Sequence, residues 1–261
     1  MKKHNEQNYI DAIQSVYPES WYIRQPDIKG FVGTVFFAET ENGTIVCKFN
    51  DKDIIQHNYQ ISQLLQAKDM IIPHTQKHIF ADTYFESYKY CPGKTLYEYM
   101  KNDMTPNQIF DIYKQTIPVQ QELSKIPPEK IKCDWGNFAY QSFVRCRKKS
   151  GSYLIALAFG FLYKTLSTRG KPRLFHNDIQ PKNLLVDEDM NLSGIIDLDS
   201  IALCNESFAV LYTLYTYPLN NYAEYIEYYE DNVGRKLNKR GIIDGLKLLQ
   251  QIRNIKRTLQ K

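Results

Sequence analysis

One short segment of the chain carries polar side chains whose types and spacing suit phosphoryl transfer. Residues 176–183 read HNDIQPKN, which places His176, Asp178 and Asn183 in an H-x-D-x-x-x-x-N pattern. Phosphoryl transfer needs a carboxylate that orients the acceptor hydroxyl and takes its proton, and oxygen ligands that hold Mg²⁺ on the nucleotide phosphates. The segment supplies that carboxylate and one amide ligand. Asp197, fourteen residues after Asn183, supplies a second metal ligand.

The residues between Asn183 and Asp197 predict a β-hairpin. LLVD (184–187) and SGIID (193–197) are short apolar runs on either side of an acidic turn. Pairing of these two runs as strands would bring Asn183 and Asp197 together at the open end of the hairpin. The alternative interpretation is a surface loop followed by an ordinary hairpin.

The two motifs together resemble those of the aminoglycoside phosphotransferase and choline kinase superfamily, small-molecule kinases with a protein-kinase-like fold. The asparagine after His176 is similar to the choline and ethanolamine kinase form of the loop. The resemblance implies that Asp178 is the catalytic base, that Asn183 and Asp197 bind Mg²⁺, and that His176 supports the loop. Lys182 is either a residue that neutralises phosphate charge or a solvated lysine.

The N-terminal part of the chain predicts the sheet that such a fold requires. Residues 28–40 and 43–50 are rich in Val, Phe, Thr and Ile, and Asn42-Gly43 between them is a strong hairpin-turn signal. Further strands are expected at 77–81 and 84–91, and helices are expected at 8–17 and 54–67. Pro92-Gly93 then marks the best boundary between two lobes.

The resemblance implies a nucleotide site in this first lobe. Lys48, on the second strand of the hairpin, would neutralise the α- and β-phosphates of ATP. GTP is also compatible. The hairpin would cover the nucleotide, hinge backbone groups would bind the adenine edge, and two apolar side chains would sandwich the ring. The residues implied are Gly30, Gly33, Val46, Lys48, Lys89, Cys91 and Ile196. Plain turn geometry and core packing are the alternative roles for the two glycines and the two apolar residues.

One departure from the superfamily concerns the partner of Lys48. Relatives normally place a glutamate on the helix after the lysine strand, and this chain has no glutamate between Asp53 and Tyr84. The candidate helix positions hold Gln56, Asn58 and Gln60. An amide binds an ammonium without the charge-assisted strength of a carboxylate, which leaves a catalytically weak, regulatory pseudokinase open as an alternative.

An acidic, tyrosine-rich stretch near the C-terminus is the candidate acceptor site. Residues 223–231 read AEYIEYYED. The resemblance implies that acidic or aromatic residues of the C-terminal helices receive a cationic amine of the acceptor. The candidates are Glu224, Glu227, Glu230 and Asp231. A solvated helix face with tyrosines packed beneath it is the alternative.

Composition sets limits on the class of protein. The 261 residues are 43% hydrophobic and 24% charged with a net charge of +4, which is typical of a globular protein and weak evidence against a nucleic-acid binder. The five cysteines form no C-x-x-C pair, so we expect a reducing, cytoplasmic setting. The longest apolar run, 153–163, is much shorter than the about 20 residues of a membrane span.

These observations predict an α+β, bilobal protein-kinase-like fold, with a small β-rich N-terminal nucleotide-binding lobe (1–91) and a larger helical lobe (92–261) that carries the catalytic loop. The expected activity is transfer of phosphate from ATP, with Mg²⁺, to a hydroxyl of an amino-sugar-like or choline-like small molecule. A protein kinase is disfavoured because only 64 residues follow Asp197 and no A-P-E motif is among them. The oligomeric state stays open.

Overall fold

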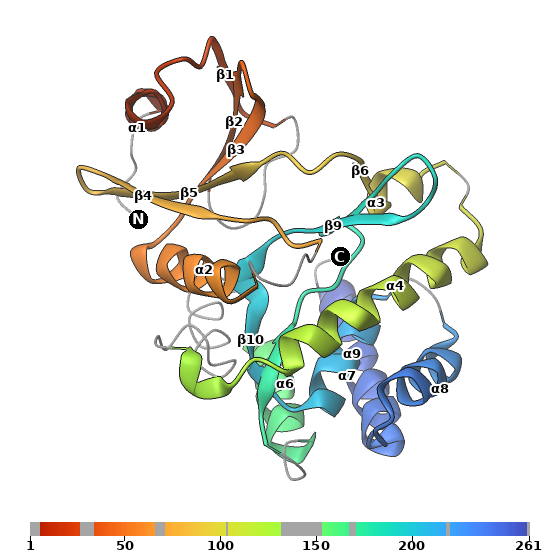
Figure 1. The fold of residues 1–261 in the computed structure, drawn as a ribbon. Helices are drawn as coiled ribbons and strands as arrows, with labels where there is room; N and C mark the ends of the chain where they lie inside the picture. Colours follow the sequence, from red (N-terminus) through yellow and green to blue (C-terminus); the bar gives the residue numbers. More distant parts are fainter. Residues whose placement is uncertain are drawn as a thin grey trace. The chain divides into compact units, whose positions relative to one another are not determined.

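The computed structural model of the chain describes residues 6–26, 34–65, 71–102, 104–131, 153–166, 171–217 and 220–259. It consists of two compact units, Met1–Pro92 and Gly93–Lys261 (Figure 1). Strands dominate the first unit and helices the second, so the α+β class predicted from the sequence is confirmed.

The first unit is built on an antiparallel sheet with strand order β1-β2-β3-β5-β4. Its elements are α1 (Glu6–Val16), β1 (Tyr22–Arg24), β2 (Thr34–Thr40), β3 (Gly43–Phe49), α2 (Lys52–Leu65), β4 (Gln76–Phe80) and β5 (Thr83–Lys89). The predicted Asn42-Gly43 hairpin is confirmed, since Thr40 pairs with Gly43 at the β2–β3 turn. Gly43 has a φ of 103°, a backbone conformation that favours glycine.

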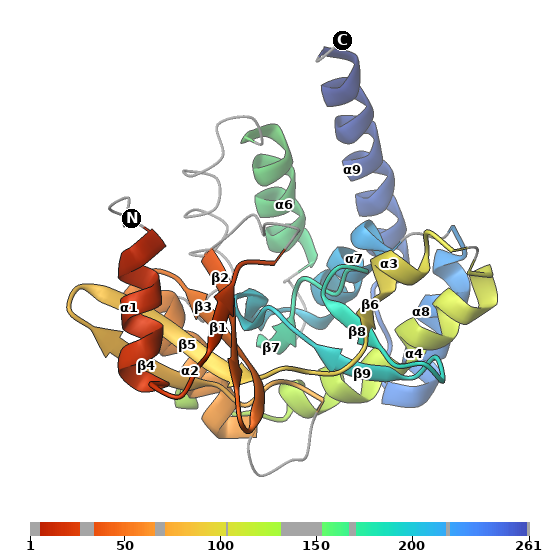
Figure 2. The same cartoon turned by 90° about the horizontal axis from the view of Figure 1, so that it is seen from above.

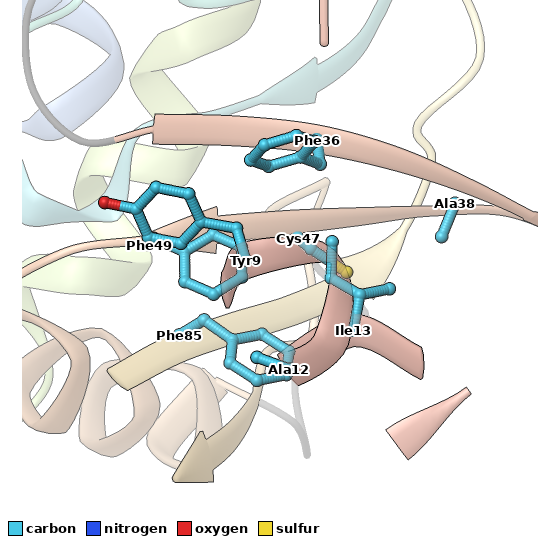
Figure 3. Close-up of a cluster of buried hydrophobic side chains, with 8 residues drawn as sticks. All are labelled: Tyr9, Ala12, Ile13, Phe36, Ala38, Cys47, Phe49 and Phe85. Carbon is cyan, nitrogen blue, oxygen red and sulfur yellow. The ribbon is translucent and has the colours of Figure 1, made fainter. Parts of the chain in front are cut away.

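The core of this unit lies on one face of the sheet, beneath α1 (Figure 3). Tyr9 of α1 packs on Phe49, with ring centroids 4.6 Å apart, and Phe49 stacks on Phe85 at 4.8 Å. Successive side chains of a strand point to opposite faces. Lys48 and Glu86, the immediate neighbours of Phe49 and Phe85, therefore lie on the other face, where α2 packs against β5.

The second unit contains two small sheets and most of the helices. The sheets are β10-β7 and β6-β8-β9, both antiparallel. Its helices are α3 (Leu96–Tyr99), α4 (Pro106–Ser124), a 3₁₀ turn (Pro128–Lys130), α6 (Tyr153–Leu166), a second 3₁₀ turn (Leu198–Ser200), α7 (Glu206–Thr216), α8 (Tyr222–Val233) and α9 (Lys239–Leu259). Its strands are β6 (Lys94–Thr95), β7 (Arg173–His176), β8 (Leu184–Val186), β9 (Leu192–Ile195) and β10 (Ile201–Cys204).

The helices of this unit gather on two sides of it. α6, α7 and α9 contact one another, and α4 contacts α8 and β7. These helices can be followed in Figures 1 and 2. Thr105 and Gln108 form a capping box that starts α4. In the described part of the chain, no helix combines the length and apolar character needed to cross a membrane.

The β8–β9 hairpin confirms the pairing predicted from LLVD and SGIID. Leu184 pairs with Ile195, and the register shifts once, between Leu185 and Val186. Strands β7 and β10 were not anticipated as a pair. His176 lies opposite Ile201, so the segment that leads into the H-x-D-x-x-x-x-N motif is anchored to the segment just after Asp197.

Candidate active site

The H-x-D-x-x-x-x-N segment forms the connection between β7 and β8, and a glutamine of α4 anchors its start. The Gln120 side chain bonds both backbone groups of His176: the His176 N–H donates to Gln120 Oε1 at 2.8 Å, and Gln120 Nε2 donates to the His176 carbonyl at 2.8 Å. Both residues are buried. The Gln120 side chain therefore hydrogen-bonds the backbone N–H and C=O of the last residue of β7, as the backbone of a neighbouring strand would.

The His176 imidazole links the two motifs. The Asp178 N–H lies 3.2 Å from His176 Nδ1, so Nδ1 accepts a hydrogen bond. The proton of the neutral ring is then on Nε2, which lies 3.1 Å from the Ile196 carbonyl and donates to it. One buried side chain thus fixes the backbone of Asp178 relative to the residue before Asp197.

The Asp178 carboxylate is oriented by two amides of its own loop. Gln180 Nε2 donates to Asp178 Oδ2 at 2.8 Å, and Asn183 Nδ2 donates to the same oxygen at 3.0 Å. Asn183 Nδ2 also lies 2.9 Å from the Asp178 carbonyl. The side chain is part-buried rather than enclosed. Amide donors stabilise an ionised carboxylate, and an oriented, accessible carboxylate is suited to accept a proton from a hydroxyl.

Asn183 and Asp197 lie at the open end of the β8–β9 hairpin. The Ile196 N–H donates to the Asn183 carbonyl at 3.0 Å, which continues the ladder to the residue before Asp197. Asn183 uses its amide nitrogen on Asp178, so the amide oxygen on the opposite side of the group is the atom suited to a cation. Asp197 has a left-handed backbone with a φ of 73°, a conformation that is rare outside glycine and is frequent at functional sites.

The donors at this end of the hairpin fit a magnesium ion. They are one carboxylate and one amide oxygen, and Mg²⁺ prefers oxygen ligands, keeps several waters and takes the rest of its shell from substrate phosphates. Within the described residues, no cluster of three or more His, Cys, Asp and Glu side chains forms a complete metal cage. These two oxygen donors would therefore suit a Mg²⁺ ion that takes the rest of its shell from water and substrate phosphates.

In the first unit, Lys48 lies on β3 and is only 6% exposed. Its strand neighbour Val46 is 5% exposed and pairs with Tyr88 of β5. On the helix that follows, one of the three candidate amide residues, Asn58, donates its amide nitrogen to Glu86 Oε1 at 2.8 Å.

The other residues expected to bind the nucleotide come from both units of the chain. Lys89 is the last residue of β5 and pairs with Ile45, and Cys91 follows it as a part-exposed residue. Ile196, also part-exposed, lies in the second unit. Gly30 and Gly33 lie outside the described residues.

The acceptor candidates are all on α8 and differ in environment. Glu224, Glu227 and Asp231 are exposed. Glu230 is buried: its carboxylate accepts the Leu237 N–H at 2.7 Å and pairs with Lys236 at 3.1 Å and Lys239 at 3.2 Å.

The contacts of Glu230 make it a structural residue. Burial acts to raise the pKa of this carboxyl, but the bonds to Leu237, Lys236 and Lys239 outweigh burial and lower the pKa. A carboxylate engaged in this way joins the end of α8 to the start of α9. Glu230 is therefore not available to bind an acceptor.

Two residues that support the site were not identified from the sequence. Asn177 is 1% exposed, and its amide nitrogen donates to the carbonyls of Phe175, Ser200 and Ala202, which ties β7 to β10. Gln120 is 56 positions before His176 along the chain. Asn177 lies in the polar run 176–178 and Gln120 in the polar run 120–122, and neither run reveals which residue the side chain contacts.

The fold and the site together define a kinase-like phosphotransferase. Residues 25–229 match the model of the phosphotransferase enzyme family, so the chain belongs to that family and the superfamily predicted from the motifs is confirmed. A comparison with curated proteins finds no match.

Solved structures support the same fold. The chain is similar to APH(2")-IIia, solved with GDP and kanamycin, at a TM-score of 0.65 and 19% identity, with 94% of this chain and 98% of that chain covered. It is similar to the type VIII aminoglycoside-3'-phosphotransferase at a TM-score of 0.66 and 13% identity, with coverage of 95% and 98%. For the choline kinase LicA from Streptococcus pneumoniae the TM-score is 0.63 and the identity 14%, with coverage of 96% and 91%.

Proposed function

We propose that the protein transfers the γ-phosphoryl group of ATP, in the presence of Mg²⁺, to a hydroxyl of a cationic small molecule of the amino-sugar or choline type. Residues 1–91 would form the nucleotide-binding lobe, and residues 92–261 the lobe of the catalytic loop and the acceptor. The observation that carries the proposal is the bonding of His176, which joins the loop of Asp178 to the segment of Asp197.

In this mechanism Asp178 is the catalytic base. Its carboxylate accepts the proton of the acceptor hydroxyl while the hydroxyl oxygen forms a bond to the γ-phosphorus. The bond from that phosphorus to the β,γ-bridging oxygen breaks, and ADP leaves. Gln180 and Asn183 keep the carboxylate oriented for this step through their hydrogen bonds to Oδ2.

Asn183 and Asp197 would hold the metal, and Lys48 would neutralise the α- and β-phosphates. A bound Mg²⁺ supplies positive charge on the phosphates of the nucleotide. Val46 and Ile196 would flank the base, whose edge would bind backbone groups at Lys89 and Cys91.

The exposed acidic side chains of α8 support a cationic acceptor. Glu224, Glu227 and Asp231 are exposed. Asn221 donates to the Glu224 carboxylate at 2.9 Å. The structures of relatives with kanamycin and of a choline kinase favour the same chemical class.

The test is a transfer assay with purified protein, ATP or GTP, and Mg²⁺ or excess EDTA. The acceptor panel contains amino-sugars, choline and ethanolamine, neutral sugars and amino-alcohols, and the readout is the mass gain of one phosphoryl group. We expect transfer to a cationic acceptor only with Mg²⁺. Running both nucleotides is needed because two of the similar structures contain GDP.

The matched control is Asp178→Ala, which should abolish transfer and preserve nucleotide affinity, because Asp178 acts on the acceptor. Tight nucleotide binding without transfer to any member of the panel would contradict the proposal and favour a regulatory protein. Phosphate on protein substrates would favour a protein kinase.

A further inference from the structure

Lys48 is buried, and a buried ammonium requires a nearby compensating charge. It is 6% exposed on the face of the sheet opposite the apolar core. Burying an unpaired charge costs several kcal/mol or more. Within Lys52–Leu65, the helix that follows has one carboxylate, Asp53, in its first turn. The strands next to β3 are the other place in the sheet where a compensating charge can lie.

The strand register places Glu86 directly opposite Lys48. The two residues are partners in the antiparallel β3–β5 pair. Side chains at directly opposed positions share one face, with Cβ atoms about 4.5–5.5 Å apart. Glu86 is itself only 2% exposed. A buried lysine and a buried glutamate therefore lie side by side, at positions fixed by backbone pairing.

A second lysine lies on the other side of Glu86, and its ammonium contacts residues of α2. Lys77 of β4 is the Glu86 partner across the β4–β5 pair. Its Nζ donates to Gln56 Oε1 at 2.7 Å and lies 5.3 Å from the centre of the Tyr59 ring. Lys77 thus has partners on α2, and Lys48 is the buried cation of this row.

A residue of α2 orients the Glu86 carboxylate. Asn58 is fully buried, and its amide nitrogen donates to Glu86 Oε1 at 2.8 Å. A bond to one carboxylate oxygen restricts rotation of the whole group and stabilises its ionised form. The helix therefore contributes an amide that holds the carboxylate, and the carboxylate itself belongs to the sheet.

We propose that Glu86 is the positioning residue for Lys48: a carboxylate on the neighbouring strand, held by Asn58, that keeps the lysine ammonium in place for the nucleotide phosphates. The inference rests on the proposed function. It explains how Lys48 could bind nucleotide phosphates although α2 carries no glutamate.

The test compares Glu86→Gln with Glu39→Gln. Glu39 is a matched control because it lies on the same face of the same sheet and accepts a hydrogen bond from Thr44 at 2.7 Å. It is four residues along β2 from Val35, the β2 partner of Lys48, or about 13 Å. Nucleotide affinity, kcat and the KM values for nucleotide and for acceptor are measured for each variant, with the melting temperature as a check on folding.

We expect Glu86→Gln to weaken nucleotide affinity and to lower kcat by about tenfold or more, the usual size of losing a charged hydrogen-bond partner. The KM for the acceptor should stay near its normal value, which a general loss of structure would not produce. Glu39→Gln should change none of these values.

The double variant Asn58→Asp/Glu86→Gln moves the negative charge to the helix side of the same hydrogen bond. We expect it to recover most of the lost nucleotide affinity, because the charge stays next to Lys48. Unchanged nucleotide affinity in Glu86→Gln, or a folded double variant without recovery, would overturn the positioning role. A tenfold affinity loss in Glu86→Gln with no transfer by the unmodified protein would overturn the proposed function and retain the positioning role.

Discussion

Lys48 and Asp178 are held in place by different kinds of structure. The position of Lys48 follows from backbone pairing of β3 with strands on both sides, β2 and β5. The position of Asp178 follows from side chains: Gln120 anchors the strand before it, His176 joins its backbone to Ile196, and two amides orient its carboxylate. The backbone hydrogen bonds between strands remain when one side chain is lost. A loop that is fixed by individual side chains loses part of its support with each of them. Apart from Glu86, whose charge is proposed to act on Lys48 directly, single substitutions should therefore disturb catalysis more readily in the loop than in the sheet.

The largest effect is expected for Asp197→Asn. Asparagine tolerates the left-handed backbone of this position, so the fold should persist. The substitution removes the negative charge that the Asp197 carboxylate would present to the metal. Metal stabilisation of the transferred group is worth several kcal/mol, so kcat should fall by about 100-fold or more. Titration of activity with Mg²⁺ measures the accompanying rise in the metal concentration required.

The control for Asp197→Asn is Asp187→Asn at the other end of the same hairpin. The Asp187 side chain accepts the Asn191 N–H at 2.8 Å, a bond within the turn. Its substitution should leave kcat and the Mg²⁺ requirement unchanged. An equal loss of activity in both variants would mean that the hairpin, and not the charge at Asp197, is what catalysis requires.

Gln120→Leu should combine a loss of stability with a loss of catalysis. It removes both bonds to the His176 backbone and leaves two buried backbone groups without a partner, which costs about 1–3 kcal/mol each. Because His176 positions Asp178, kcat should fall by about tenfold at a temperature where the variant is still folded. Chemical denaturation and steady-state kinetics measure the two effects.

Ser87→Ala is the matching substitution in the sheet. Its hydroxyl lies 2.7 Å from both the Tyr17 hydroxyl and His78 Nε2, so its removal should cost about 1–3 kcal/mol of stability. Ser87 is adjacent to Glu86 but points to the other face of β5. Nucleotide affinity and kcat should therefore stay unchanged, and a fall in kcat as large as that of Gln120→Leu would remove the difference between sheet and loop.

The smallest effect is expected for Lys182→Ala. Lys182 is exposed, and its Nζ lies 5.1 Å from the centre of the Tyr97 ring. An exposed contact of this kind is worth about 0.5–1 kcal/mol. We expect a slight fall in stability and less than about a threefold change in kcat. A larger fall in kcat would show that Lys182 acts on the phosphates.

Local patterns predicted much of the fold and the central part of the site. Asp178 and Asn183 are five residues apart in one loop, and Asp197 follows a short hairpin, so spacing along the chain reflects distance in space. The Asn42-Gly43 turn likewise specified the β2–β3 pair, because glycine at that position permits the backbone the turn requires.

The residues that sequence analysis missed act over long separations. Gln120 reaches His176 from 56 positions away, and Glu86 lies opposite Lys48 through a strand register that no turn next to Lys48 determines. The resemblance placed the partner of Lys48 on the following helix, where Asn58 carries an amide in place of a carboxylate. The carboxylate was on the next strand of the sheet, and only the pairing of β3 with β5 reveals it.

The strand register of Lys48 and Glu86 bears on how such an enzyme could be controlled. In protein kinases the glutamate that pairs with the phosphate-binding lysine is carried by a helix, and placement of that helix turns activity on and off. A carboxylate on the neighbouring strand stays next to the lysine as long as the backbone hydrogen bonds between β3 and β5 are intact. A kinase built in this way would be active whenever it is folded, and its output in the cell would be set by the amount of protein and by the supply of acceptor.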